Sequence, residues 1–130
     1  MSRRIWAGVM AAAALIAVAP VAFAVETLDG KTFSGTIGKK GETAGNPDDF
    51  IFKDGQFEST LCEQFGYGTG AYKTSIADGA TRFSAETTSK TGGKMAWTGT
   101  IKEGHLQGSV VTTENGASSE MWFNGTVKTN

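Results

Sequence analysis

The sequence predicts an all-β protein, a small antiparallel up-and-down β-barrel of about eight strands, with a β-sandwich as the alternative fold. Several segments alternate apolar and polar residues with period two, the pattern of half-buried strands. Two-residue turns that end in Gly join such segments. The chain has 18 glycines and only 2 prolines in 130 residues, and nothing after residue 24 has a helical pattern. An even number of antiparallel strands lets the first and last strands pair and close a barrel.

Residues 1–24 have the features of a secretory signal peptide. Arg3 and Arg4 precede an apolar run over residues 5–18, and Ala22-Phe23-Ala24 is a small-residue cleavage site. The alternative is an uncleaved membrane anchor, for which the apolar run is short. We therefore expect a periplasmic or secreted protein whose residues 25–130 form a single β-barrel domain. The outward residues of its strands are polar, so no stable membrane insertion is expected after cleavage.

The mature chain begins with one strand, a loop and a hairpin. Residues 32–38 alternate as a strand, and the polar, glycine-rich residues 38–46 predict an exposed loop at the rim of any binding site. Asp54-Gly55 is a preferred hairpin turn, which would place Phe52 opposite Phe57. The nearby acidic residues do not have the spacing of an EF-hand, so they are expected to be solvated charges and not metal ligands. These residues are Asp48, Asp49, Asp54 and Glu58.

Residues 61–78 alternate aromatic residues with glycines and predict a distorted strand near residues 67–74. The aromatic side chains there either pack in the core or form a wall that faces a ligand. Cys62 is the single cysteine of the chain and has no internal disulfide partner. It is interpreted as a small buried residue, with intermolecular pairing or a chemical role as alternatives.

The second half of the chain predicts four more strands. Residues 81–88 alternate as a half-buried strand, and residues 94–113 form a hairpin around the turn Glu103-Gly104. This register places Gly99 opposite Gly108 on the apolar face. The last strand, residues 119–128, follows another turn and leaves Trp122 facing outward as a contact point.

Glycines recur inside the predicted strands, within a motif of large apolar, polar, Gly, hydroxyl and β-branched residues. Gly in a strand marks a bend, a bulge or a close approach. Either neighbouring aromatic side chains cover the glycines, or the glycines keep a ligand cavity open. In the second case the cavity would be lined by inward residues, and the candidate ligand-binding residues are Phe52, Phe57, Tyr67, Tyr72, Phe83, Trp97, Gly99, Gly108 and Phe123.

Several segments together resemble a family of short exported bacterial proteins with a lipocalin-like or calycin-like barrel. They are residues 49–59, Cys62, Gly66-Tyr67, Phe83 to Glu86, Trp97 to Gly99, and Trp122 to Gly125. The resemblance covers nearly the whole mature chain and implies a barrel fold. It implies no particular activity and assigns no functional residues, and the Gly-x-Trp signature of true lipocalins is absent from the first strand.

The sequence contains no recognisable catalytic constellation, so we expect a protein that is not an enzyme. Its single histidine, His105, falls at the edge of a tight turn, and general acid–base chemistry needs a positioned partner. Removing Arg3 and Arg4 takes the formal net charge from −1 to −3, and the scattered basic residues do not suggest nucleic acid. No cofactor or metal is expected. The predicted roles are a monomeric binder of a small apolar or aromatic ligand or, alternatively, a protein-interaction module such as an exported inhibitor or envelope partner.

Overall fold

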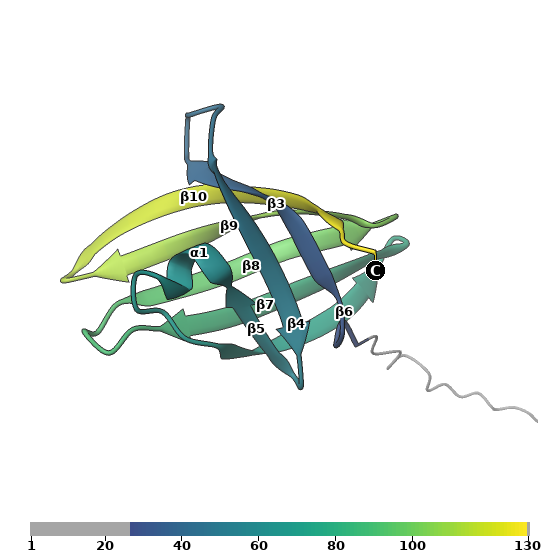
Figure 1. Cartoon of the computed structure of the whole chain (residues 1–130), viewed down its shortest axis with the longest axis horizontal. Coiled ribbons are helices and arrows are strands. Elements are labelled where there is room, and N and C mark those ends of the chain that lie inside the picture. The colour runs from purple at the N-terminus through teal and green to yellow at the C-terminus, as the bar shows by residue number, and fades with distance from the viewer. Residues whose placement is uncertain (1–26, 130) are drawn as a thin grey trace, which may run out of the picture.

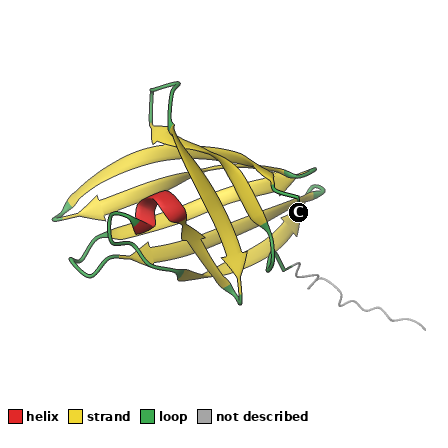
Figure 2. Ribbon diagram, in the orientation of Figure 1, coloured by secondary structure: helices red, strands yellow, loops and turns green. Residues whose placement is uncertain are grey.

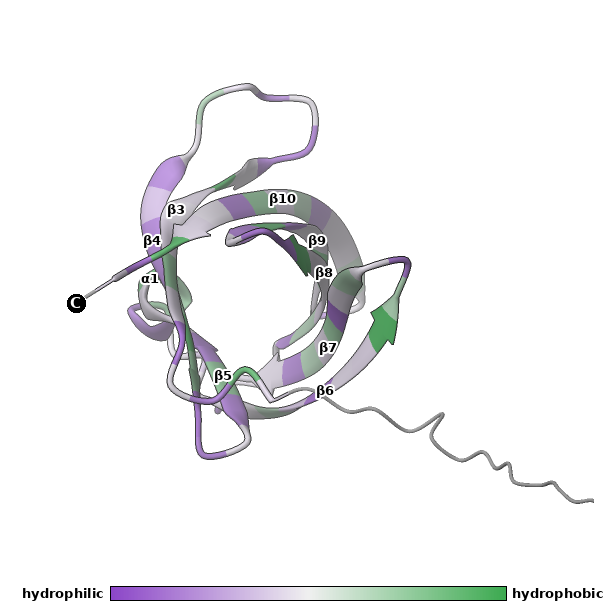
Figure 3. Ribbon diagram, turned by 90° about the vertical axis from the view of Figure 1, so that its right-hand side faces the viewer, coloured by the Kyte–Doolittle hydropathy of each residue, from purple (hydrophilic) through white to green (hydrophobic). Residues whose placement is uncertain are grey.

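The structure, a computed structural model, describes residues 27–129, and the predicted signal peptide lies outside the described residues. The described chain forms a closed barrel in which all neighbouring strands are antiparallel, as the sequence predicted, and not a sandwich. Figure 1 shows the barrel from the side, and Figure 3 looks along it and shows the strands as a ring. In chain order the elements are β3 (Thr32–Lys39), β4 (Asn46–Lys53), β5 (Gln56–Ser59), α1 (Thr60–Glu63), β6 (Gly70–Ala77), β7 (Ala80–Thr88), β8 (Lys94–Lys102), β9 (His105–Glu114) and β10 (Ala117–Val127).

Two-residue turns connect four pairs of neighbouring strands and fix their register. Both residues of each turn have positive φ, which is the requirement of a type I′ turn and matches the twist of the flanking strands. The turns are Asp54-Gly55, Asp78-Gly79, Glu103-Gly104 and Asn115-Gly116. The registers predicted for two hairpins are confirmed: Phe52 pairs with Phe57, and Gly99 pairs with Gly108. The turn at Asp78-Gly79 was not predicted.

The barrel closes where β10 pairs with β3 along seven residue positions, from Met121 opposite Lys39 to Val127 opposite Phe33. The weakest part of the ladder lies between β5 and β6, which pair at only two positions. The strand predicted near residues 67–74 is found as β6 at Gly70–Ala77, and the residues just before it differ from the prediction. Residues 60–63 form α1, Tyr67 makes a single bridge to Ser89, and β6 begins only at Gly70.

The short helix α1 corrects the expectation of a chain without helices (Figure 2). Ser59 is its N-cap, and the Ser59 hydroxyl accepts a hydrogen bond from the Cys62 backbone N–H at 3.2 Å. The carboxylate of Asp48 accepts hydrogen bonds from the Leu61 backbone N–H at 2.9 Å, the Thr60 hydroxyl at 3.2 Å and the Ser59 hydroxyl. Asp48 was expected to be a solvated charge, but it is buried, because it binds the free donors at the start of α1.

The interior of the barrel is one hydrophobic core in which aromatic side chains predominate. Inward positions alternate along the strands as predicted, for example Met95 and Trp97 on β8. Leu28 belongs to the core although it precedes β3, and it is almost completely buried. This burial was not predicted, since an isolated Leu in a polar lead-in has no periodic pattern. No helix among the described residues is long and apolar enough to span a membrane.

Candidate functional site

The inward aromatic residues proposed as ligand contacts lie together at the centre of the barrel and contact one another. The ring centroids of Phe57 and Trp97 are 4.8 Å apart, those of Phe52 and Phe83 are 5.1 Å apart, and those of Trp97 and Phe123 are 5.3 Å apart. These are the separations of packed edge-to-face and tilted aromatic pairs. Each of the five side chains is at most 3% exposed. Ring contacts therefore occupy the space around these side chains, and their role as ligand contacts stays a prediction.

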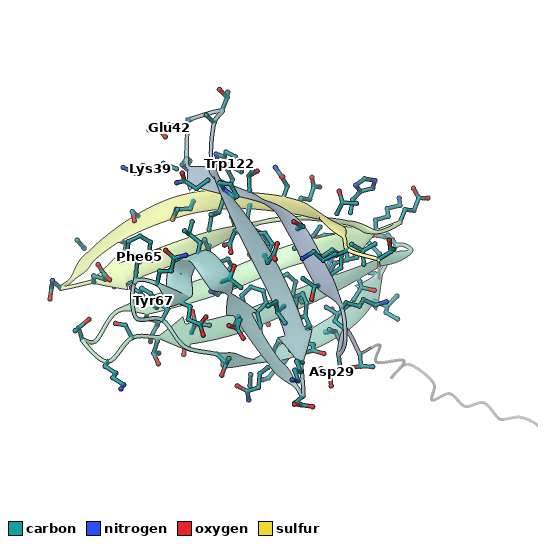
Figure 4. The ribbon with its side chains drawn as sticks, in the orientation of Figure 1. Asp29, Lys39, Glu42, Phe65, Tyr67 and Trp122 are labelled. Carbon is teal, nitrogen blue, oxygen red and sulfur yellow. The ribbon has the colours of Figure 1, made fainter. Side chains whose placement is uncertain are left out.

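The two tyrosines of the candidate set lie at the margin of this cluster, toward the two ends of the barrel. The Tyr67 hydroxyl donates a hydrogen bond to Glu114 Oε2 at 2.6 Å, near the end that carries α1 (Figure 4). Burial, reinforced by the Glu114 carboxylate, raises the pKa of Tyr67 to about 12. Tyr67 therefore fixes the chain at this end as a neutral hydrogen-bond donor.

At the other end, Tyr72 holds the lead-in segment before β3. Its hydroxyl donates to Asp29 Oδ1 at 2.6 Å and accepts from the Leu28 backbone N–H at 3.0 Å. Burial and the bond to Asp29 raise the pKa of Tyr72, and the same bond lowers the pKa of Asp29. The ring of Tyr72 packs edge-on against Phe52 at 5.0 Å. Tyr72 thus holds the segment that carries Leu28 against this end of the barrel.

Aromatic rings cover the glycine pair at the centre of the sheet. A Cβ atom placed on Gly99 would lie 2.6 Å from Cε1 of Phe83, and one on Gly108 would lie 2.7 Å from Cζ of Phe123. Ordinary van der Waals contacts are longer, so both glycines are required for the rings to lie where they do. The sequence left open whether aromatic side chains cover the glycines or the glycines keep a ligand cavity open. At Gly99 and Gly108 the structure shows aromatic side chains that cover the glycines.

The close packing at this pair has a consequence on the other side of the sheet. Because no side chain separates the strands from the rings of Phe83 and Phe123, the sheet lies close to the core at Gly99 and Gly108. A trough of about 910 Å³ lies on the outer face over β6 to β10, and all four residues contribute to its floor. Four strand spacings of roughly 4.8 Å give it a length of about 19 Å. We call it the outer trough.

Two cross-strand rows of outward side chains line the outer trough, and their order follows from the register of the sheet. One row runs from β10 to β6 through Trp122, Ser109, Thr98, Ser84 and Lys73. The adjacent row runs through Asn124, Gln107, Thr100, Arg82 and Ser75. Small hydroxyl groups thus occupy the middle of the trough. An aromatic ring and two amides lie at the β9–β10 end, and two cations lie at the β6–β7 end. These groups can bind a polar ligand through many hydrogen bonds.

Trp122 forms the end of the outer trough on β10 and is half-buried, not fully exposed as the sequence suggested. Its indole Nε1–H donates to the backbone oxygen of Glu42 at 2.8 Å, and its ring lies against Gly38 and Gly45. Figure 4 shows Trp122 at the base of the loop that joins β3 and β4 and projects from the barrel. This loop, which was expected to form the rim of a site, therefore holds the indole in a fixed orientation.

Sequence reasoning missed the outer trough because it assigned the outward polar residues to solvent. The alternation does show that Ser84, Thr98 and Ser109 point outward, and the hairpin register places the last two side by side. The outer trough includes the two glycines that the rings of Phe83 and Phe123 cover, and strand patterns do not reveal this packing. Among the described residues, no group of His, Cys, Asp and Glu side chains could hold a metal ion. Cys62 is buried, and burial raises the pKa of its thiol.

Comparisons of the chain with family models, curated proteins and solved structures find no match. The resemblance to short exported bacterial barrels therefore stays a prediction.

Proposed function

We propose that the mature protein is an exported binding protein that recognises a polar ligand in the outer trough. One observation carries this proposal: the register of β6 to β10 aligns two rows of hydrogen-bonding side chains over a depression of about 910 Å³. Sheet surfaces that only face solvent have no need of such a depression. Concave sites with several convergent polar groups are typical of ligand binding.

The packing of the interior supports a site outside the barrel over one inside it. The aromatic side chains that would contact an internal ligand already pack against one another at centroid separations of 4.8 to 6.3 Å. An apolar ligand at their position would have to displace rings that already pack against one another, which is unfavourable. The outer trough needs no such rearrangement, because it is open in the protein alone.

Two tryptophans make a direct test of this proposal. Of the three in the chain, only Trp97 and Trp122 lie in residues 25–130. The Nε1–H of Trp97 donates to the Thr87 hydroxyl inside the barrel, and that of Trp122 donates to Glu42 at the trough. A two-dimensional ¹⁵N NMR spectrum of the mature protein will therefore contain one indole signal for each location.

The titration uses tetragalacturonic acid and its neutral methyl ester as polar probes, and N-phenyl-1-naphthylamine as an apolar probe. We expect at least one polar probe to shift the Trp122 signal and leave the Trp97 signal in place. Trp122→Phe should remove the shifting signal and so confirm its assignment. A shift of Trp97 with the apolar probe, together with an unchanged Trp122 signal for both polar probes, would show that the ligand site is the interior.

A further inference from the structure

We infer that the ligand of the outer trough is an acidic oligosaccharide, a chain of hydroxyl-rich sugars that carry carboxylate groups. This inference rests on the proposed function and adds the chemical class of the ligand. It follows from three features of the trough: the sign of its charge, the kind of hydrogen-bonding groups on its floor, and the aromatic ring at one end.

The charge of the outer trough is positive, although the mature chain is acidic. Lys73 and Arg82 line the trough, and no lining residue is an Asp or a Glu. Neither cation forms an ion pair with any described residue. Glu86 and Glu120 lie on the next outward row, which is outside the trough on the side of Trp122. Their carboxylates form ion pairs with lysines at 3.7 and 3.5 Å. A negatively charged group would therefore be attracted to the β6–β7 end of the trough without repulsion from its surroundings.

The floor between the charged and aromatic ends consists of neutral polar groups. Hydroxyls of Thr98, Thr100 and Ser109 lie at its centre, and the amides of Gln107 and Asn124 lie beside them. Hydroxyls and amides both donate and accept, so they are complementary to sugar hydroxyls, which do the same. The Trp122 ring, held by Glu42, offers an apolar surface against which the C–H face of a sugar ring can lie.

Other classes of ligand fit these features less well. Protein interfaces depend on aromatic and arginine anchors at their centre, where Ser and Thr are under-represented, whereas the centre of this trough is made of Ser and Thr. The closed sheet has no free edge to which a peptide strand could add. Single-stranded nucleic acid needs successive aromatic platforms along a basic groove, and the trough has one aromatic residue that is not fully buried, Trp122, at its end.

The test measures the affinity of the mature protein for tetragalacturonic acid by isothermal titration calorimetry. The matched probes are its fully methyl-esterified form, which has the same sugar chain without charge, and hexaglutamic acid, which has carboxylates without sugars. We expect the acid to bind about tenfold or more tightly than the ester, because hydrogen bonds to charged groups are the stronger ones. Hexaglutamic acid should bind no more tightly than the ester.

Substitutions test whether the preference for the acid comes from the two cations of the trough. Lys73→Gln/Arg82→Gln should weaken binding of the acid about tenfold and leave binding of the ester unchanged. The control is Lys102→Gln, which removes one positive charge, where the double variant removes two, from the same outer face but outside the trough, and it should change the affinity less than about twofold. Both sets of side chains are exposed, so the substitutions leave the core intact.

The outcomes separate the inference from the proposed function. If the ester binds as tightly as the acid and shifts the Trp122 signal, the trough is a binding site but the acidic class is wrong. If hexaglutamic acid binds as tightly as the sugar acid, the trough is only an anion site and the glycan class is wrong. Failure of both the acid and the ester to shift Trp122 would contradict both proposals.

Discussion

Hydrogen bonds between side chains stabilise the two ends of this barrel. They connect segments at the points where the backbone hydrogen bonds between strands end. Tyr67 with Glu114 acts at one end, and Tyr72 with Asp29 acts at the other. The Tyr67 pair is the more buried of the two and lies against Gly93, where a side chain would collide with the phenol oxygen. These residues therefore stabilise the fold as neutral phenols paired with carboxylates.

The protonation of Tyr67 is a testable consequence. Its pKa in the folded protein, about 12, exceeds the ordinary value of 10. The folded state thus retains a proton that the unfolded state loses, and the free energy of unfolding should fall as the pH rises from about 10 to about 12. The chain has only two tyrosines, so Tyr72→Phe isolates Tyr67 in an ultraviolet absorbance titration.

We expect half-titration near pH 12 in folded Tyr72→Phe and near pH 10 in denaturant. Tyr67→Phe is the matched variant, and its unfolding free energy should depend less on pH above 10. Half-titration of folded Tyr72→Phe near pH 10 would show that the phenol is exposed and that its bond to Glu114 is absent.

At the scale of elements, most strands and their turns were predictable, whereas the turn at Asp78-Gly79 and the structure between β5 and β6 were not predicted. Period-two alternation and Gly-containing turns are local signals, so seven of the strands lie close to their predicted positions. The start of α1 depends on Asp48, which lies on a different element and eleven residues before Ser59 in the chain. No local pattern relates a carboxylate on β4 to the free backbone donors of a helix turn, and the residue was therefore assigned to solvent.

This dependence of α1 on Asp48 predicts the behaviour of two variants. Asp48→Ala leaves the Ser59 hydroxyl and the Leu61 N–H without their acceptor, and unsatisfied buried groups cost about 1 to 3 kcal/mol each. Asp48→Asn keeps one side-chain oxygen as an acceptor in nearly the same volume, so it should lose clearly less stability. Urea denaturation of the protein measures both. Equal stability of Asp48→Ala and wild type would contradict the role assigned to this carboxylate.

At the scale of the whole molecule, the rings of Phe83 and Phe123 pack against Gly99 and Gly108 inside the barrel, and the same four residues contribute to the outer trough. The closed topology and the inward position of these glycines could be predicted from turn positions and alternation. The sequence could not predict whether side chains fill the interior, because that depends on the volumes of side chains from strands far apart in the sequence. The burial of Leu28 and the outer trough were missed for the same reason, since both arise only when the barrel closes.

The most direct test of this account is the stability of Gly99→Ala and Gly108→Ala, measured by urea denaturation beside Gly68→Ala. A methyl group on Gly99 would meet the Phe83 ring, and one on Gly108 would collide with the Thr98 backbone oxygen, whereas one on Gly68 would meet nothing within 4 Å. We predict a loss of roughly 1 to 3 kcal/mol for Gly99→Ala and at least as much for Gly108→Ala. Gly68→Ala should be neutral or more stable by about 0.4 to 1 kcal/mol. Core variants as stable as Gly68→Ala, with weaker binding of N-phenyl-1-naphthylamine than wild type, would instead show a hollow barrel that holds an apolar ligand.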